Sequence, residues 1–162
     1  MNFLKQTPFF LVLIISGFFL SSCEEDNRFK IDYTLAEDHI YDISAADSSV
    51  TRESGLTIYF IEEGSGIFEV ERRDQVRVFY TGRKWVTGEI FDSSFKNGVT
   101  TPVTFNNIGG LVEGFKEGLI GMKEGEKRVL IIPPDLGYGD SNNRNLRDDT
   151  LRFDIELAEI LL

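Results

Sequence analysis

The chain has 162 residues, with 27 acidic and 17 basic side chains, so its formal net charge is −10. This length allows one ordinary domain and an additional segment, but not two full-sized domains. A chain of this charge is repelled by nucleic acid, which excludes DNA or RNA binding as a main function.

The first 22 residues have the pattern of a secretory signal. Lys5 is their only charged residue, and the apolar run 9–20 is too short to span a bilayer as a helix. The run leads into Leu-Ser-Ser-Cys at 20–23, which resembles the lipobox of bacterial lipoproteins. Cys23 is the only cysteine, so no intramolecular disulfide can form. We expect Cys23 to be lipidated and to anchor the protein to a membrane; the alternative is an ordinary signal with an incidental cysteine.

Residues 23–54 are predicted to form an acidic tether between the anchor and the folded domain. The acids at 24–26 follow the cysteine directly. In some Gram-negative lineages such acids resemble an export mark for the outer face of the outer membrane, and a solvated spacer explains them equally well. We therefore expect the protein in the cell envelope, anchored to the outer membrane, with the periplasmic and surface faces both open.

Little regular structure is predicted within this tether. The spacing of Ile31 and Leu35 predicts a short helix at about 29–39. The Ser, Ala and Asp content of 42–52 is typical of a linker. His39 is the only histidine and has no cysteine nearby, so it is predicted to be an ordinary surface residue.

Alternating apolar residues predict strands in the rest of the chain, which is expected to fold as one domain over 55–162. The predicted strands are 56–61, 76–81, 128–132 and 151–158. Prolines at 133 and 134, which cannot donate ladder hydrogen bonds, end the third of these strands.

A single helix is predicted in this domain, because Leu111, Phe115 and Leu119 are spaced by four residues. Its two glycines lower helix stability by about 1 kcal/mol each relative to alanine, so we expect the helix to lie close against a sheet. Several strands around one short amphipathic helix predict an α+β domain, with the helix covering the concave face of an antiparallel sheet.

Conventional catalytic constellations are missing from the sequence. It has no second histidine, no cysteine cluster, no nucleophile elbow and no phosphate-binding glycine loop between a strand and a helix. An enzyme with these residues would act through the shape and environment of its site, and no metal or cofactor is expected.

Five motifs follow one another along the predicted domain. They are VFYTG at 78–82, GEIFDSS at 88–94, LVEGFKEGLIGM at 111–122, IPPDLGYG at 132–139 and LRFDIEL at 151–157. In order and spacing these motifs resemble the FKBP-type peptidyl-prolyl cis-trans isomerases. The resemblance implies an antiparallel sheet of five or six strands wrapped around a short helix, with the active site between them.

The resemblance also implies which residues form the site. Tyr80, Asp92 and Tyr138 match catalytic positions. The implied substrate-binding residues are Phe91, Val103, Phe105, Leu111, Val112, Phe115 and Phe153, with Leu146 as the apolar residue that closes over the substrate. For Phe105, Leu111 and Phe153, plain core packing is an equal alternative. Asp92 is costly to bury unless it is hydrogen-bonded, and Tyr80 is its expected partner.

The implied reaction is rotation about an X–Pro bond, whose barrier of about 18–20 kcal/mol arises from amide resonance. A dry aromatic pocket destabilises the planar amide more than the twisted one. Phe91, Phe115 and Phe153 would hold the prolyl ring. Tyr138 would donate to a substrate carbonyl, and Asp92 would orient the site without proton transfer. We expect an isomerase that assists the folding of exported, proline-containing polypeptides; the alternative is a module that binds proline segments without turnover.

Three features depart from the family pattern. Phe115 stands where the family usually has tryptophan. The connection 83–87 is one residue longer than is common, which predicts either a shift of Phe91 and Asp92 or a bulge. The loop 140–149 is polar and lacks the usual Ile-Pro or Pro-Pro element. No dimerisation segment is evident, so a monomer is the default expectation.

Overall fold

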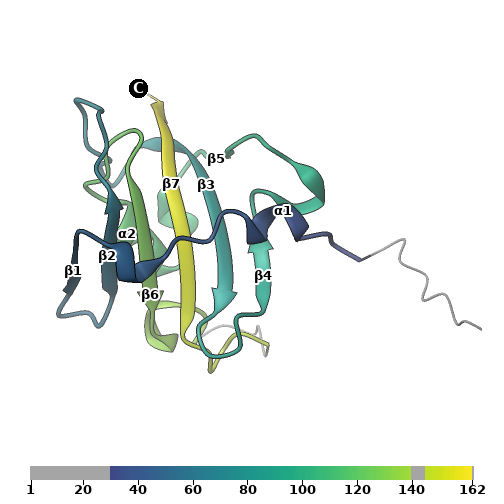
Figure 1. Ribbon diagram of the computed structural model, residues 1–162. Helices are drawn as coiled ribbons and strands as arrows, with labels where there is room; N and C mark the ends of the chain where they lie inside the picture. Colours follow the sequence, from purple (N-terminus) through teal and green to yellow (C-terminus); the bar gives the residue numbers. More distant parts are fainter. Residues whose placement is uncertain (1–29, 140–144, 162) are drawn as a thin grey trace, which may run out of the picture. The chain divides into compact units, whose positions relative to one another are not determined.

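The computed structural model describes residues 30–139 and 145–161 (Figure 1). The predicted signal (1–22), the lipidation site Cys23 and the acids at 24–26 lie outside the described residues, as does the first half of the polar loop, 140–144. No helix within the described ranges is long and apolar enough to cross a membrane.

Seven strands form one antiparallel sheet in the described part of the chain. They are β1 (Ser48–Thr51), β2 (Thr57–Glu62), β3 (Gln75–Lys84), β4 (Ile90–Ser93), β5 (Val103–Phe105), β6 (Lys127–Ile132) and β7 (Leu151–Leu161). Their order is β1-β2-β6-β7-β3-β4, and β5 pairs with β3 beside β4. The four predicted strands correspond to β2, β3, β6 and β7. The three additional strands have only three or four residues each, too few for their alternation to be recognised in the sequence.

In the ranges that the structure describes, two α-helices and several short 3-10 turns lie before the first strand and between the later ones. They are α1 (Thr34–Glu37), η2 (Ile43–Ala45), η3 (Lys96–Gly98), η4 (Ile108–Gly110), α2 (Glu113–Leu119) and η5 (Pro134–Leu136). The helix predicted at 29–39 is therefore present only as the single turn of α1. The helix predicted from the spacing of Leu111, Phe115 and Leu119 is α2.

Helix α2 packs against β6, and its two glycines make this close approach possible. A Cβ atom at Gly118 would lie 2.3 Å from Cδ1 of Leu130, and one at Gly114 would lie 2.6 Å from Cγ2 of Ile132. The buried Arg128 donates from Nη1 to the Gly118 carbonyl at 2.9 Å, so it satisfies a carbonyl at the C-terminal end of the helix. The expectation of a helix pressed against the sheet is confirmed.

The main core lies between α2 and the concave face of the sheet. It contains inward-facing residues of the long strands and of the helix, including Leu56, Ile58, Val76, Val78, Phe115, Leu119, Leu130, Ile132, Ile155 and Leu157. Burial of these side chains is the dominant favourable contribution to folding. Because α2 covers only part of the concave face, the aromatic side chains beside it remain partly accessible.

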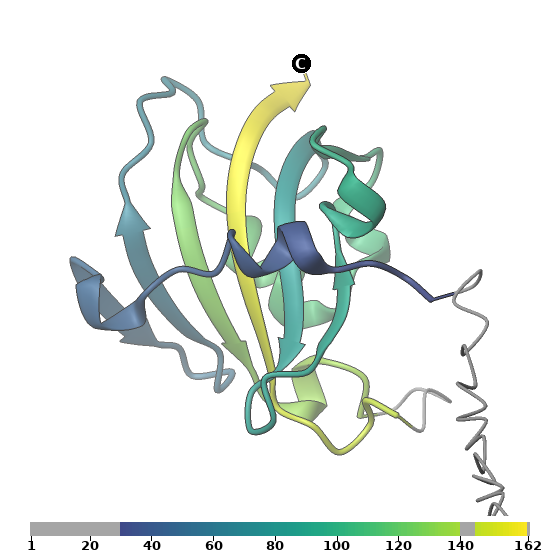
Figure 2. The same cartoon turned by 45° about the vertical axis from the view of Figure 1, so that its right-hand side comes forward.

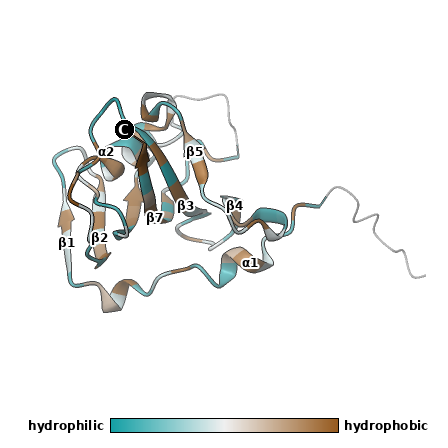
Figure 3. Ribbon diagram, turned by 90° about the horizontal axis from the view of Figure 1, so that it is seen from above, coloured by the Kyte–Doolittle hydropathy of each residue, from teal (hydrophilic) through white to brown (hydrophobic). Residues whose placement is uncertain are grey.

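The opposite face of the sheet is crossed by residues 31–47, which we call the N-terminal segment. Figure 2 shows it running over the sheet on the side away from α2, and the view from above in Figure 3 agrees. The backbone N–H of Tyr41 donates to Asp154 at 2.9 Å, and Arg152 donates to the Tyr41 carbonyl. Near its end, the N–H of Asp47 donates to the Phe60 carbonyl at 2.9 Å.

This packing differs from the predicted tether. Ile31 to Leu162 form one compact unit, and β1 lies inside the range 23–54 that the sequence assigns to a linker. The segment is held through backbone groups and through the buried Ala36 and half-buried apolar side chains such as Leu35 and Ile40. The spacing of its apolar residues predicts a short helix but not its docking on the sheet. His39 is likewise half-buried, stacked on Phe95 with ring centroids 3.7 Å apart, rather than free on the surface.

Candidate active site

A pocket of about 240 Å³ opens between α2 and the concave face of the sheet. Ten residues line it: Tyr80, Phe91, Asp92, Phe105, Gly110, Leu111, Val112, Phe115, Tyr138 and Phe153. Nine of them are site residues predicted from the motifs. Gly110 was not predicted, because a residue without a side chain carries no chemical signal.

Edge-to-face aromatic contacts form the base of the pocket. Phe115, only 3% exposed, contacts Phe153 with centroids 4.8 Å apart and an interplanar angle of 81°. It also contacts Tyr80 at 5.9 Å and 82°. Phe91 meets Phe153 at 5.6 Å and 86°. Rings packed in this way hold one another in place, so the pocket has a firm apolar wall.

A β-bulge brings two consecutive residues, Phe91 and Asp92, into the same pocket. Adjacent residues on a regular strand point to opposite faces. Here Gly82 pairs with Asp92 and Arg83 with Ile90, which leaves Phe91 as the extra residue of β4. The bulge that the long 83–87 connection predicts is therefore present.

Gly82 is required opposite this bulge. A Cβ atom on Gly82 would lie 2.6 Å from Cε1 of Phe153 and 2.8 Å from Cζ of Phe91. Any side chain at this position would displace both rings. The glycine of the VFYTG motif thus has a steric role in forming the pocket.

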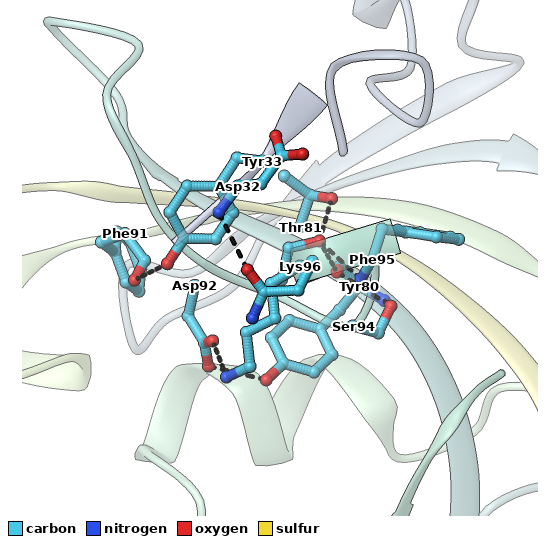
Figure 4. Close-up of polar contacts among 11 residues, drawn as sticks. Asp32, Tyr33, Tyr80, Thr81, Phe91, Asp92, Ser94, Phe95 and Lys96 are labelled. Atoms are coloured by element: carbon cyan, nitrogen blue, oxygen red, sulfur yellow. Dashed lines mark hydrogen bonds and ion pairs between the residues drawn. The ribbon is translucent and has the colours of Figure 1, made fainter. Parts of the chain in front are cut away.

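Asp92 is held by two partners (Figure 4). The Tyr80 hydroxyl donates to Oδ2 at 2.7 Å, as predicted, and Nζ of Lys96 lies 2.8 Å from Oδ1. Lys96 was not predicted as a site residue. Its position four residues after an acid was the only available signal, and a turn separates the two in the chain. The carboxylate is therefore fixed at the pocket wall with both oxygens engaged.

The tyrosines of the site are kept protonated. Burial and then the hydrogen bond to Asp92 raise the pKa of Tyr80 far above its usual value of 10.0. Burial, followed by the charge of Asp92, also raises the pKa of Tyr138. Both hydroxyls consequently remain hydrogen-bond donors over the physiological pH range.

Two predicted substrate-binding residues do not line the pocket. Val103 pairs with Val78 in the ladder of β5 and β3, two residues and about 6–7 Å along the strand from Phe105, and is not among the residues that line the pocket. Leu146 is 6% exposed and lies in an adjoining groove rather than over the pocket mouth.

Within the described residues, no cluster of three or more His, Cys, Asp or Glu side chains could hold a metal ion. The site consists of aromatic and aliphatic walls, two tyrosine hydroxyls and one paired carboxylate. Such a site can bind an apolar ring, donate a hydrogen bond to a carbonyl and exclude water.

Comparison with known proteins shows the family of the chain. The sequence model of the FKBP-type peptidyl-prolyl cis-trans isomerase family matches residues 68–158. The chain belongs to this family. The fold and the enzyme class predicted from the five motifs are thereby confirmed.

Individual relatives agree with this assignment. The chain is 38% identical over 115 residues to FK506-binding protein 1A of Neurospora crassa, covering 69% of this chain and 93% of that protein. It is 40% identical over 111 residues to the FKBP-type 22 kDa peptidyl-prolyl cis-trans isomerase of Escherichia coli, covering 67% of this chain and 52% of that protein. It spans 42% of FK506-binding protein 2B of Rhizopus delemar.

Solved structures share the fold. FkpA from Escherichia coli superposes with a TM-score of 0.63 at 34% identity, covering 70% of this chain and 52% of that one. AtFKBP13 superposes with a TM-score of 0.59 at 29% identity, covering 70% and 99%. The chain thus spans about half the length of some of these FKBPs and nearly all of others.

Proposed function

We propose that the pocket between α2 and the sheet catalyses rotation about X–Pro bonds by binding the twisted amide better than the planar one. The observation that carries this proposal is the aromatic pocket itself, in which Phe115, Phe153 and Phe91 pack edge to face around an apolar space. A planar amide loses hydration when it enters such a space, and its charge-separated resonance form loses most. The twisted amide has already lost that form, so the barrier falls.

Phe91, Phe115 and Phe153 hold the prolyl ring in this mechanism. Phe115 provides no N–H donor, so the base of the pocket is wholly apolar, which suits a ring of methylene groups. The smaller ring in place of an indole leaves more room at the base. Residues of the pocket wall thereby select the substrate by shape and by exclusion of water.

Tyr138 donates from its hydroxyl to a substrate carbonyl. Its raised pKa keeps the proton on the oxygen, and its ring forms part of the pocket wall. Asp92 orients the site through the hydroxyl of Tyr80. No proton is transferred, since the reaction neither makes nor breaks a bond to hydrogen.

A rate measurement tests this mechanism. The chain from residue 24 onward, which retains the compact unit Ile31–Leu162, would be assayed with short X–Pro peptides. We expect acceleration that falls about twofold to tenfold in Tyr138→Phe, the range for one lost hydrogen bond, and further in Phe91→Ala. If the folded chain binds these peptides and gives no acceleration, it is a proline-binding module instead.

We further propose that the protein acts on exported polypeptides while anchored by a lipid on Cys23 to the outer membrane, as a monomer. The Leu-Ser-Ser-Cys sequence at 20–23, after a basic residue and an apolar run, supports the anchor. Radiolabelled palmitate should be incorporated into the full chain in a bacterial host, and not into Cys23→Ser. Equal labelling of both would contradict lipidation at this residue, and fractionation of the labelled cells would test the outer membrane.

A further inference from the structure

A groove of about 760 Å³ adjoins the pocket, and we call it the outer groove. Phe91, Asp92 and Tyr138 line both the pocket and the outer groove. Its other walls come from separate parts of the chain, among them Tyr33, Lys84 and Leu146. The pocket and the outer groove therefore share a boundary formed by these three residues.

Tyr33 is held rigidly at the wall of this groove. Its hydroxyl donates to the carbonyl of Phe91 at 2.9 Å (Figure 4). Next to it, the N–H of Asp32 donates to Oδ1 of Asn97 at 3.0 Å, and the N–H of Asn97 donates to the Asp32 carbonyl at 2.7 Å. These three bonds fix the start of the N-terminal segment to the chain on both sides of Asp92.

The walls of the outer groove differ chemically from those of the pocket. Tyr33 and Leu146 provide apolar surface. Lys84 lies 3.3 Å from Glu89 and 3.3 Å from Asp149, so one cation is placed between two carboxylates. Mixed walls of this kind suit an extended polypeptide, which presents apolar side chains and polar backbone groups in turn.

We propose that the outer groove binds the polypeptide segment next to the substrate proline, with Tyr33 as a specificity-determining wall. This inference rests on the proposed function, since it places the proline in the pocket. A polypeptide substrate continues beyond its proline at about 3.3–3.6 Å per residue, and the residues shared by pocket and groove give that continuation a direct path. Tyr33 lies outside the region 68–158 that matches the family model, so the model does not assign this wall.

The test compares a short X–Pro peptide with versions extended by four residues on either side of the proline. KM, kcat and a dissociation constant from fluorescence anisotropy would be measured for each peptide. For the unchanged chain, extension on one side should lower KM and the dissociation constant. Tyr33→Ala should remove about threefold to tenfold of that gain, the loss expected for one aromatic contact. Because the Tyr33 hydroxyl also holds the Phe91 carbonyl, the short peptide can lose some rate, but less than the extended peptides.

Matched variants separate the contribution of the Tyr33 ring from that of its hydroxyl and from nonspecific effects of a substitution. Tyr33→Phe keeps the ring and should retain most of the gain from extension. Phe68→Ala removes an aromatic side chain that is 60% exposed and lines neither cavity, and it should change nothing. If Tyr33→Ala fails to fold, Glu89→Trp replaces a side chain that is 64% exposed on the groove wall, and should weaken only the extended peptides.

Each outcome decides the proposal. No gain from extension on either side, or an equal loss for short and extended peptides in Tyr33→Ala, would overturn it. The anisotropy readout keeps the two proposals distinguishable. An inactive chain would refute catalysis, whereas a length-dependent dissociation constant that is sensitive to Tyr33→Ala would still support the groove.

Discussion

The two faces of the sheet are built from different interactions. The concave face is apolar and aromatic, and α2 covers it through a glycine-permitted contact with β6. The opposite face buries a polar pair, Arg152 and Asp154, beneath the N-terminal segment. The hydrophobic packing of the concave face follows the periodicity of the sequence, so it can be predicted without the structure. A buried ion pair covered by backbone groups has no comparable signature, so the two faces differ in how far sequence alone can describe them.

The largest effect should come from breaking the ion pair. Asp154 is 1% exposed and accepts from Arg152 at 2.6 Å and from the N–H of Tyr41 at 2.9 Å. Asp154→Ala leaves the buried guanidinium of Arg152 without its carboxylate, so the free energy of unfolding should fall by about 3–5 kcal/mol. Urea unfolding measures this loss.

The double variant Arg152→Met with Asp154→Leu is the matched control. It removes both charges, so much of the stability lost in the single variant should return. If the free energy of unfolding fell by less than about 1 kcal/mol in Asp154→Ala, the ion pair would behave as a solvated surface pair instead.

On the concave face, Gly82→Ala is the sharpest change. The added carbon would lie 2.6 Å from Phe153 and 2.8 Å from Phe91, so both rings must move. We expect a loss of about 1–3 kcal/mol in the free energy of unfolding and a lower kcat/KM, because the displaced rings hold the prolyl group. In Gly110→Ala no atom lies within 4 Å of the added carbon, and stability should be kept. Unchanged kcat/KM in Gly82→Ala would contradict the roles given to the two rings.

A smaller effect on kcat/KM should distinguish the contributions of Tyr80 and Lys96, the two partners of Asp92. Asp92→Asn weakens the charge-assisted bond from Tyr80, worth about 1.5–3 kcal/mol, and should lower kcat/KM at least about tenfold. The Lys96 side chain is 46% exposed, so Lys96→Met removes a solvent-screened pair and should change the rate less than about fivefold. Equal damage from both variants would show that the lysine orients the carboxylate, and high salt would then reproduce the loss.

The smallest effect concerns alkaline pH. Burial raises the pKa of Tyr80 and Tyr138, so both keep their protons when the tyrosines of the unfolded chain ionise. Their contribution to stability is fully present below about pH 10, the unfolded pKa, and is lost as the pH rises through the higher folded values. Isomerase activity should stay level up to about pH 9. Tyr80→Phe should reduce the fall in stability above pH 10, and an unchanged slope would contradict this origin.

Sequence reasoning reached the pocket because its residues belong to compact motifs. Phe91 and Asp92 are adjacent in the chain, and the long connection before them predicted the bulge that turns both inward. Leu111, Val112 and Phe115 belong to the motif at 111–122, and the family resemblance assigns them to the pocket that they line. Val103 was assigned by matching a family position that is often aromatic, and it is not among the residues that line the pocket.

Tyr33 and Lys96 escaped prediction for a different reason. The hydroxyl of Tyr33 reaches Phe91, 58 residues away, and this contact depends on the docking of the N-terminal segment on the sheet. Lys96 reaches Asp92 across the turn at 94–95. Such contacts form only in the completed tertiary fold, so a local sequence pattern does not predict them.

Strand β1 has a consequence for an enzyme that meets unfolded chains. Its four residues are all exposed, three of them carry hydroxyl groups, and it closes the edge of β2. Unfolded polypeptides readily add to a free, long, apolar strand edge, and a short polar edge is a poor template for such pairing. The segment that looked like a spacer therefore also protects the protein from aggregating with its own substrates.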